Sequence, residues 1–152
     1  MAITALLSRD PPRAEAELQA FLSGRTGDGA VVAFVGLARD SAGGGPVTSL
    51  HLDHYAGFTE RSLETIATDA GARFPVSDIR VIHRCGDVAP GEVIVFVAVA
   101  APHRRAAFEA ADYLMDRLKT EAAFWKREDG PDGSRWIEPT DQDREDLRRW
   151  SD

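Results

Sequence analysis

Apolar and polar positions alternate along the chain with the periods of strands and helices. The continuous apolar run Val31–Val35 predicts a strand buried on both faces, and Val93–Ala101 predicts a longer apolar strand. Alternation from Thr48 to Leu52 predicts a strand with one exposed face. Further strands are expected at Ile3–Leu7, Ile79–His83, Ala123–Arg127 and Arg135–Glu138.

Helical spacing separates these strands at three places. Asp10 is a candidate N-cap for a first helix, and Thr59 is a candidate cap for a second helix that Pro75 ends. A third helix is expected to open at Pro102. Its predicted buried face consists of Phe108, Ala111, Leu114, Met115 and Leu118.

The resulting order, β-α-β-β-α-β-β-α-β-β, predicts an α+β fold with a mostly antiparallel sheet and packed helices. We expect one domain over residues 1–138 and a charged tail, helical or loose, over residues 139–152. Apolar residues make up 43% of the 152 residues, which is enough to bury a core without disulfides or metals.

Composition narrows the classes of function. A net charge of −7 argues against general nucleic-acid binding. No apolar run resembles a signal peptide or reaches membrane-spanning length, so we expect a cytoplasmic protein. The lone Cys85 cannot form an internal disulfide and is expected to be a small buried group.

Standard cofactor and metal motifs are missing from the sequence. Gly43–Gly45 lacks the lysine and hydroxyl residue of a phosphate-binding loop and is typical of a flexible connection. The four histidines do not show the pair spacing of a zinc site. The sequence therefore predicts neither a metal nor a cofactor.

Two groups of basic residues are candidates for chemistry. His103, Arg104 and Arg105 open the third helix, where backbone N–H groups favour an anion; alternatively, the arginines pair with carboxylates elsewhere. Lys119 and Lys126 flank an apolar Phe-Trp pair. Burial and a neighbouring cation would lower a lysine's pKa and make it a base or nucleophile. Alternatively, one lysine complements the helix dipole and the other is solvated.

Five segments, in order, resemble the large, catalytic subunit of molybdopterin synthase: residues 31–39, 52–59, 81–86, 102–108 and 119–128, followed by Gly133, Trp136 and Glu138. The resemblance implies an α/β hammerhead-type fold and a homodimer. It also implies that each subunit binds a small ubiquitin-like sulfur-carrier subunit ending in a Gly-Gly thiocarboxylate. The implied reaction transfers that sulfur to cyclic pyranopterin monophosphate, forming the molybdopterin dithiolene in molybdenum cofactor biosynthesis.

The resemblance also assigns roles to single residues. The family's catalytic pair corresponds here to Lys119 and Lys126, and its phosphate- and pterin-binding residues correspond to Arg39, His103 and Arg104. Arg39 would be an ordinary surface arginine without the resemblance. Ala123 stands where family members often have proline, so the start of the following strand is expected to be looser.

Helix geometry bears on the number of subunits in a site. His103 and Lys119 lie at opposite ends of one predicted helix, about 24 Å apart at the usual rise per residue. One small molecule cannot contact both within a subunit. A shared site would therefore combine the lysines of one subunit with His103 and Arg104 of its twin.

Two other functions remain open from the sequence. One is a dimeric scaffold that docks the partner's tail without catalysis, and the two intact lysines argue against it. The other is a small phosphate-ligand hydrolase that uses His103, and the absence of a nucleophile and a metal site argues against that.

Overall fold

The computed structural model describes residues 1–42 and 45–151. Most of the predicted glycine connection Gly43–Gly45 lies outside these described residues. The elements, in chain order, are β1 (Ala2–Ser8), α1 (Ala14–Leu22), β2 (Ala30–Leu37), β3 (Ser41–Ala42), β4 (Gly45–Pro46), β5 (Ser49–His54), α2 (Phe58–Arg73), β6 (Asp78–Arg84), β7 (Gly86–Val88), β8 (Val93–Ala101), α3 (Arg104–Glu121), β9 (Phe124–Gly130), β10 (Gly133–Ile137) and α4 (Asp141–Arg148).

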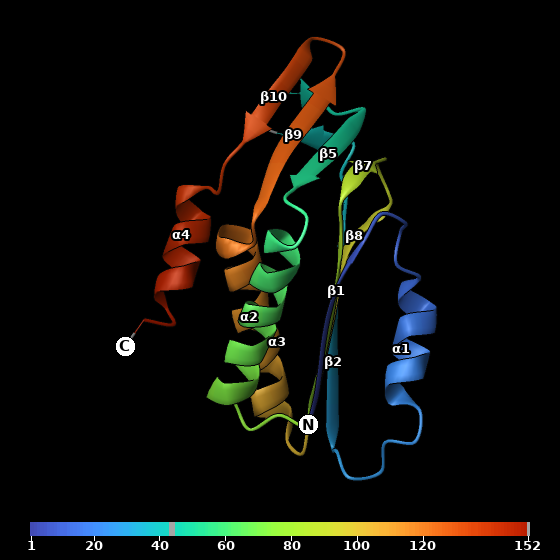
Figure 1. Cartoon of the computed structure of the whole chain (residues 1–152), viewed down its shortest axis with the longest axis vertical. Helices are drawn as coiled ribbons and strands as arrows, with labels where there is room; N and C mark the ends of the chain where they lie inside the picture. The colour runs from blue at the N-terminus through green and yellow to red at the C-terminus, as the bar shows by residue number, and fades with distance from the viewer. Residues whose placement is uncertain (43–44, 152) are drawn as a thin grey trace.

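A four-stranded sheet in the order β1-β6-β8-β2 forms the centre of the molecule. β1 pairs with β6 in parallel, and the other neighbours are antiparallel. Helices α2 and α3 cover one face of this sheet and α1 covers the other (Figure 1). The apolar run of β8 is buried between these layers, with Phe96 to Ala101 fully shielded from solvent.

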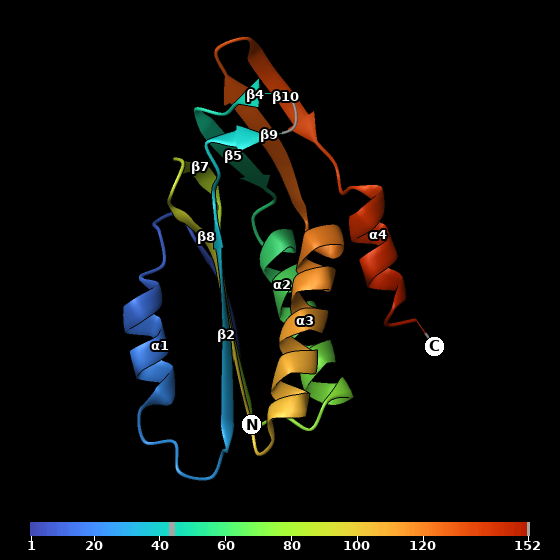
Figure 2. The ribbon, with the colours of Figure 1, turned by 180° about the vertical axis from the view of Figure 1, so that it is seen from behind.

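A second sheet, β10-β9-β5-β7, extends beyond one end of the first and is antiparallel throughout. Figure 2 shows β9 rising directly out of α3 into this second sheet. Leu52 and Val88 are fully buried beneath it. The expected α+β fold with mostly antiparallel sheets is therefore confirmed, and so is the burial of Cys85.

Two predictions of burial are wrong. Strand β2 is not buried on both faces, because it forms the edge of the first sheet, and Phe34 and Val35 are each 40% exposed. On α3 the predicted inner face includes Ala111, Leu114 and Leu118, but Phe108 is 57% exposed. The helical period places these residues on one face of α3, but it does not show where the sheet that covers this face ends.

The two predicted helix caps are also wrong. Helix α1 begins at Ala14, so Asp10 lies too far upstream to cap it. The N-cap of α2 is Gly57, whose positive φ of 84° favours glycine, and the Glu60 carboxylate accepts the Gly57 backbone N–H. Thr59 is instead fully buried, and its hydroxyl donates to the Ala123 carbonyl.

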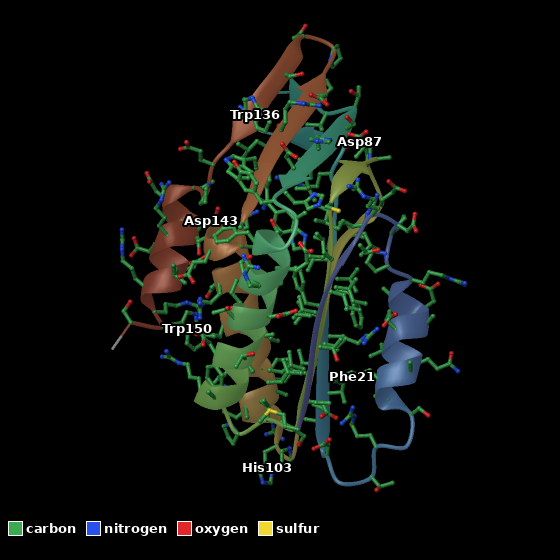
Figure 3. All side chains as sticks on the ribbon, viewed as in Figure 1. Phe21, Asp87, His103, Trp136, Asp143 and Trp150 are labelled. Atoms are coloured by element: carbon green, nitrogen blue, oxygen red, sulfur yellow. The ribbon has the colours of Figure 1, made fainter. Side chains whose placement is uncertain are left out.

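The charged tail folds as helix α4, which begins after the N-cap Thr140. The residues that follow α4 dock on α3. The Trp150 indole N–H donates to the Asp116 carboxylate, and the Trp150 ring packs edge-to-face against Tyr113 and Phe74 (Figure 3). Of the helices in the described residues, none is both long and apolar enough to cross a membrane.

Candidate active site

Lys119 and Lys126 are the only lysines in the sequence, and every other strongly basic side chain is an arginine. This bias matters because arginine stays protonated in proteins, whereas a lysine can lose its proton when its surroundings disfavour the charge. Lys119 lies in the last turn of α3 and Lys126 on the first half of β9. Among the described residues, neither lysine forms an ion pair or hydrogen bond.

The electrostatics of Lys126 differ from those of an ordinary surface lysine. Burial lowers its pKa, the positive charge of Lys119 lowers it further, and the resulting pKa is about 8. The carboxylate of Asp143 opposes this shift to a smaller extent. Lys126 can therefore exchange a proton near neutral pH, as a general acid or base must.

The short connector between α3 and β9 fixes the relative position of the two lysines. The buried Thr59 hydroxyl donates a 2.7 Å hydrogen bond to the Ala123 carbonyl, and the Ala123 N–H donates to the Ser62 hydroxyl at 3.1 Å. The N-terminal part of α2 thus holds Ala123 through both its N–H and its carbonyl. A proline here could not donate the second bond, so the structure does not bear out the looser strand start expected at Ala123.

Two hollows meet at the lysine pair. The apolar hollow, of about 380 Å³, is lined by Phe34, Val35, Gly36, Leu37, His83, Ile94, Val95, Met115, Leu118, Lys119 and Lys126. The polar hollow, of about 140 Å³, is lined by Leu118, Lys119, Thr120, Ala122, Phe124, Lys126, Ile137, Glu138, Pro139, Thr140 and Asp143. Both lysines line both hollows, so two different reactants could approach them from two sides.

Helix α4 supplies one wall of the polar hollow. Figure 3 places Asp143 on the first turn of α4, close to the start of β9. The Asp143 carboxylate accepts the Thr140 N–H and fixes the chain where it enters this helix. The tail, which the sequence predicts to be helical or loose, therefore borders the site.

Arg39 lies just past the end of β2, on the exposed side of the chain. Backbone hydrogen bonds from Ala38 to Glu92 and from Gly91 to Ala38 hold this strand end in place. Arg39 lines neither hollow, but Leu37, two residues earlier, lines the apolar one. Arg39 thus follows a strand that lines the apolar hollow, but it lines neither hollow itself.

His103 and Arg104 lie at the other end of α3 from the lysines (Figure 3). Both are exposed, and they line neither hollow. Among the described residues, no carboxylate pairs with Arg104 or Arg105, so the ion-pair alternative for these arginines is not realised within one chain. The predicted site residues therefore form two groups, far apart in a single subunit.

Sequence reasoning did not single out His83, whose ring lines the apolar hollow beside both lysines. A histidine within an apolar strand is usually a satisfied core residue, and the sequence carries no signal that separates the two cases. No group of three or more potential metal-ligating side chains gathers within the described residues.

The family profile described as "MoaE protein" matches residues 7–121. The chain belongs to the MoaE family. The match includes Lys119 and ends before Lys126, but full-length relatives cover the rest of the chain.

Relatives of this MoaE family chain carry a functional name. The molybdopterin synthase catalytic subunit of Caulobacter vibrioides is 55% identical over 133 residues, 88% of this chain and 87% of the relative. The molybdopterin biosynthesis MoaE protein from Burkholderia ambifaria has the same fold, with a TM-score of 0.82, 41% identity and coverage of 100% and 99% of the two chains. A more distant chain shares the fold at 20% identity and a TM-score of 0.68, covers 93% of this chain and 90% of its own length, and belongs to a complex of subunits 1 and 2 of molybdopterin-converting factor from Helicobacter pylori.

Proposed function

We propose that Lys119 and Lys126 carry out the chemistry of this chain, which functions as a molybdopterin synthase catalytic subunit and is a sulfurtransferase of molybdenum cofactor biosynthesis. The observation that supports the residue assignment is the half-buried Lys126, with its pKa of about 8 beside a second lysine. A scaffold without catalysis would have no need for such an amine, because a lowered lysine pKa costs folding stability.

The two lysines take different parts in sulfur transfer. Lys119 is exposed and attracts the anionic thiocarboxylate at the end of a small ubiquitin-like sulfur-carrier subunit. Lys126 supplies or accepts a proton as the acyl carbon–sulfur bond breaks and a carbon–sulfur bond forms on the acceptor. In each transfer the thiocarboxylate sulfur bonds to an acceptor carbon, which loses an oxygen substituent, and water then attacks the acyl carbon, so that the partner's Gly-Gly tail leaves as a carboxylate. Two such transfers to cyclic pyranopterin monophosphate build the dithiolene.

The apolar hollow is the place for the pterin ring. Its volume of about 380 Å³ suits a small bicyclic ring system, and Phe34, Leu37 and Met115 provide apolar walls. The partner's tail then reaches the lysines through the polar hollow, beneath α4. Arg39, exposed just beyond the strand that lines this hollow, would meet the substrate's phosphate.

A homodimer completes the site. His103 and Arg104 cannot meet the lysines within one subunit, because the length of α3 separates them. The exposed apolar residues of edge strand β2 support pairing with a second copy, since a bare apolar edge is otherwise a liability. The twin would then bring its own His103 and Arg104 to the phosphate, and with two carrier subunits the assembly would be a heterotetramer in the cytoplasm.

The test is product formation. The wild-type chain is mixed with the thiocarboxylated carrier subunit and cyclic pyranopterin monophosphate, and molybdopterin is measured. Lys119→Ala should lower turnover about 100-fold or more, whereas the exposed control Arg13→Ala should leave it unchanged. A wild type that binds the carrier and makes no product would favour the scaffold, and release of inorganic phosphate would favour the hydrolase.

A further inference from the structure

His83 is a buried polar side chain with no role in the proposed chemistry so far. It lies at the end of the central strand β6, opposite Val95 of β8, and is 4% exposed. Its ring stacks on the ring of Phe124, with 4.2 Å between the two centroids. Phe124 lies two residues before Lys126 on β9. This stacking fixes the plane of the imidazole in the lining of the apolar hollow, which the two lysines also line.

One ring nitrogen of His83 already has a hydrogen-bond partner. Nδ1 lies 2.8 Å from the backbone carbonyl oxygen of Arg84. A carbonyl oxygen can only accept, so Nδ1 carries the hydrogen and Nε2 carries a lone pair in the neutral ring. Among the described residues, no group donates a hydrogen bond to Nε2.

The neutral ring is the stable form at physiological pH. Burial lowers the pKa of His83 to about 4, and the positive charge of Lys126 adds to this effect. Lys126, with a pKa of about 8, would hold a shared proton about 10,000-fold more favourably than His83. His83 is therefore a poor general base but a fixed hydrogen-bond acceptor.

The chemistry of the apolar hollow makes this acceptor distinctive. The other lining side chains are apolar except for the two lysines, which are donors when charged. We propose that His83 Nε2 accepts a hydrogen bond from a ring N–H of the pterin and so selects and orients a nitrogen heterocycle in this hollow. This inference rests on the proposed function and adds a substrate-binding residue to it.

The physical reason for selectivity is the cost of leaving Nε2 unpaired. A bound ligand excludes water from the hollow, so a ring without an N–H at this place would bury a lone pair with no donor. A heterocycle with a correctly placed N–H replaces the lost water. Sites of this kind discriminate against analogues that lack the donor more strongly than purely apolar pockets do.

A matched pair of variants tests the proposal. His83→Phe keeps a ring on Phe124 and removes the acceptor, whereas His83→Gln keeps an acceptor near the position of Nε2 and removes the ring. With the full chain and cyclic pyranopterin monophosphate, we expect His83→Phe to raise the Kd about tenfold, while His83→Gln stays within about threefold of wild type. Binding of the thiocarboxylated carrier should be unchanged in both. Equal pterin affinity in wild type and a folded His83→Phe would overturn the proposal.

A measurement on the wild type covers the case in which His83→Phe does not fold. The sequence holds four histidines, so ¹⁵N-histidine NMR can resolve Nε2 of His83, assigned with His83→Gln. Saturating substrate should move the Nε2 resonance in the direction expected when this nitrogen accepts a hydrogen bond. A resonance that stays in place in the saturated complex would refute the contact. Failure of the wild type to bind any pterin would overturn the proposed function, and this inference with it.

Discussion

The positive charge of Lys119 makes Lys126 harder to protonate. The two side chains line the same pair of hollows from the end of α3 and the start of β9. Together with burial, this proximity brings the pKa of Lys126 to about 8. Neither lysine forms an ion pair in the described part of the chain, and the Asp143 carboxylate offsets their mutual repulsion only in part, so an arriving anion would relieve it further.

Removal of Lys119 should raise the pKa of Lys126. Lys119→Ala eliminates a neighbouring cation and leaves the burial intact, so the pKa of Lys126 should rise by a fraction of a unit to about one unit. ¹³C-lysine NMR measures this directly, because Lys126 is then the only lysine in the chain. Lys119→Arg keeps the charge and should leave the pKa near 8. A pKa that does not move in Lys119→Ala would mean that burial alone sets it.

Lys126 should reduce the stability of the folded protein at neutral pH. Its pKa is lower in the folded state than in the unfolded chain, so the unfolded state binds more protons between about pH 8 and 10.5, and the penalty fades as the pH rises through that window. Lys126→Met should therefore raise the free energy of unfolding by up to about 3 kcal/mol at pH 7.

Chemical denaturation at pH 7 and pH 10 measures this effect. The gain from Lys126→Met should shrink strongly at the higher pH, and the exposed control Lys119→Met should show no comparable gain. A Lys126→Met variant that is less stable than wild type at pH 7 would show that the ammonium group has a stabilising partner in solution.

His83 should make the protein sensitive to acid. Its pKa is about 4 in the folded state against 6.5 in the unfolded chain, so the unfolded state takes up a proton first as the pH falls below 6.5. This single group should cost about 2 kcal/mol of stability between pH 7 and pH 5. The loss of stability over this range should be smaller by that amount in His83→Phe, as urea unfolding at the two pH values would show.

Subunit mixing tests whether the site is shared. Arg104→Ala and Lys119→Ala should each be nearly inactive alone. If one subunit gives the lysines and its twin gives Arg104, each mixed dimer has one intact site, and equal mixing after unfolding and refolding should restore about a quarter of wild-type turnover. If both groups act within one subunit, the mixture should stay as inactive as its components.

The hydrogen bonds that fix the connector between α3 and β9 should matter more for turnover than for folding. Thr59→Val keeps the volume of the buried side chain but removes the hydrogen bond to the Ala123 carbonyl, at a cost of about 1–3 kcal/mol. Because the connector sets the position of Lys126 relative to Lys119, kcat should fall about tenfold or more in protein that is still folded. Ser62→Thr retains a hydroxyl for the Ala123 N–H and serves as the control.

Much of the architecture could be predicted because periodicity reports local structure and one buried face. The run Val93–Ala101 and the alternation before Leu52 both predicted strands that the structure contains. Short strands such as β7 carry too few residues for a period, and they form because β5 offers a neighbouring edge. The exposure of Phe34 depends on which strand lies at the sheet edge, and this is a property of the whole topology.

The site was predictable only in part for a similar reason. Lys119 and Lys126 lie seven residues apart, so the sequence itself keeps them close. His83 joins them through a sheet register and a stacking contact with Phe124, both of which link distant segments. Thr59 looked like a helix cap, and only the packing of α2 against the α3–β9 connector showed that its hydroxyl bonds elsewhere.

The confinement of lysine to the site has a practical consequence for handling the protein. An amine-reactive reagent has three targets in the sequence: the N-terminus, Lys119 and Lys126. Covalent attachment to a sensor surface or a fluorescent dye through amines would therefore modify the proposed catalytic pair unless the reaction is confined to the N-terminal amine. Because the sequence has only two lysines, mild acylation followed by mass spectrometry reports the accessibility of Lys119 and Lys126. A bound carrier tail or pterin that protects either lysine would lower the acylation of the peptide that contains it.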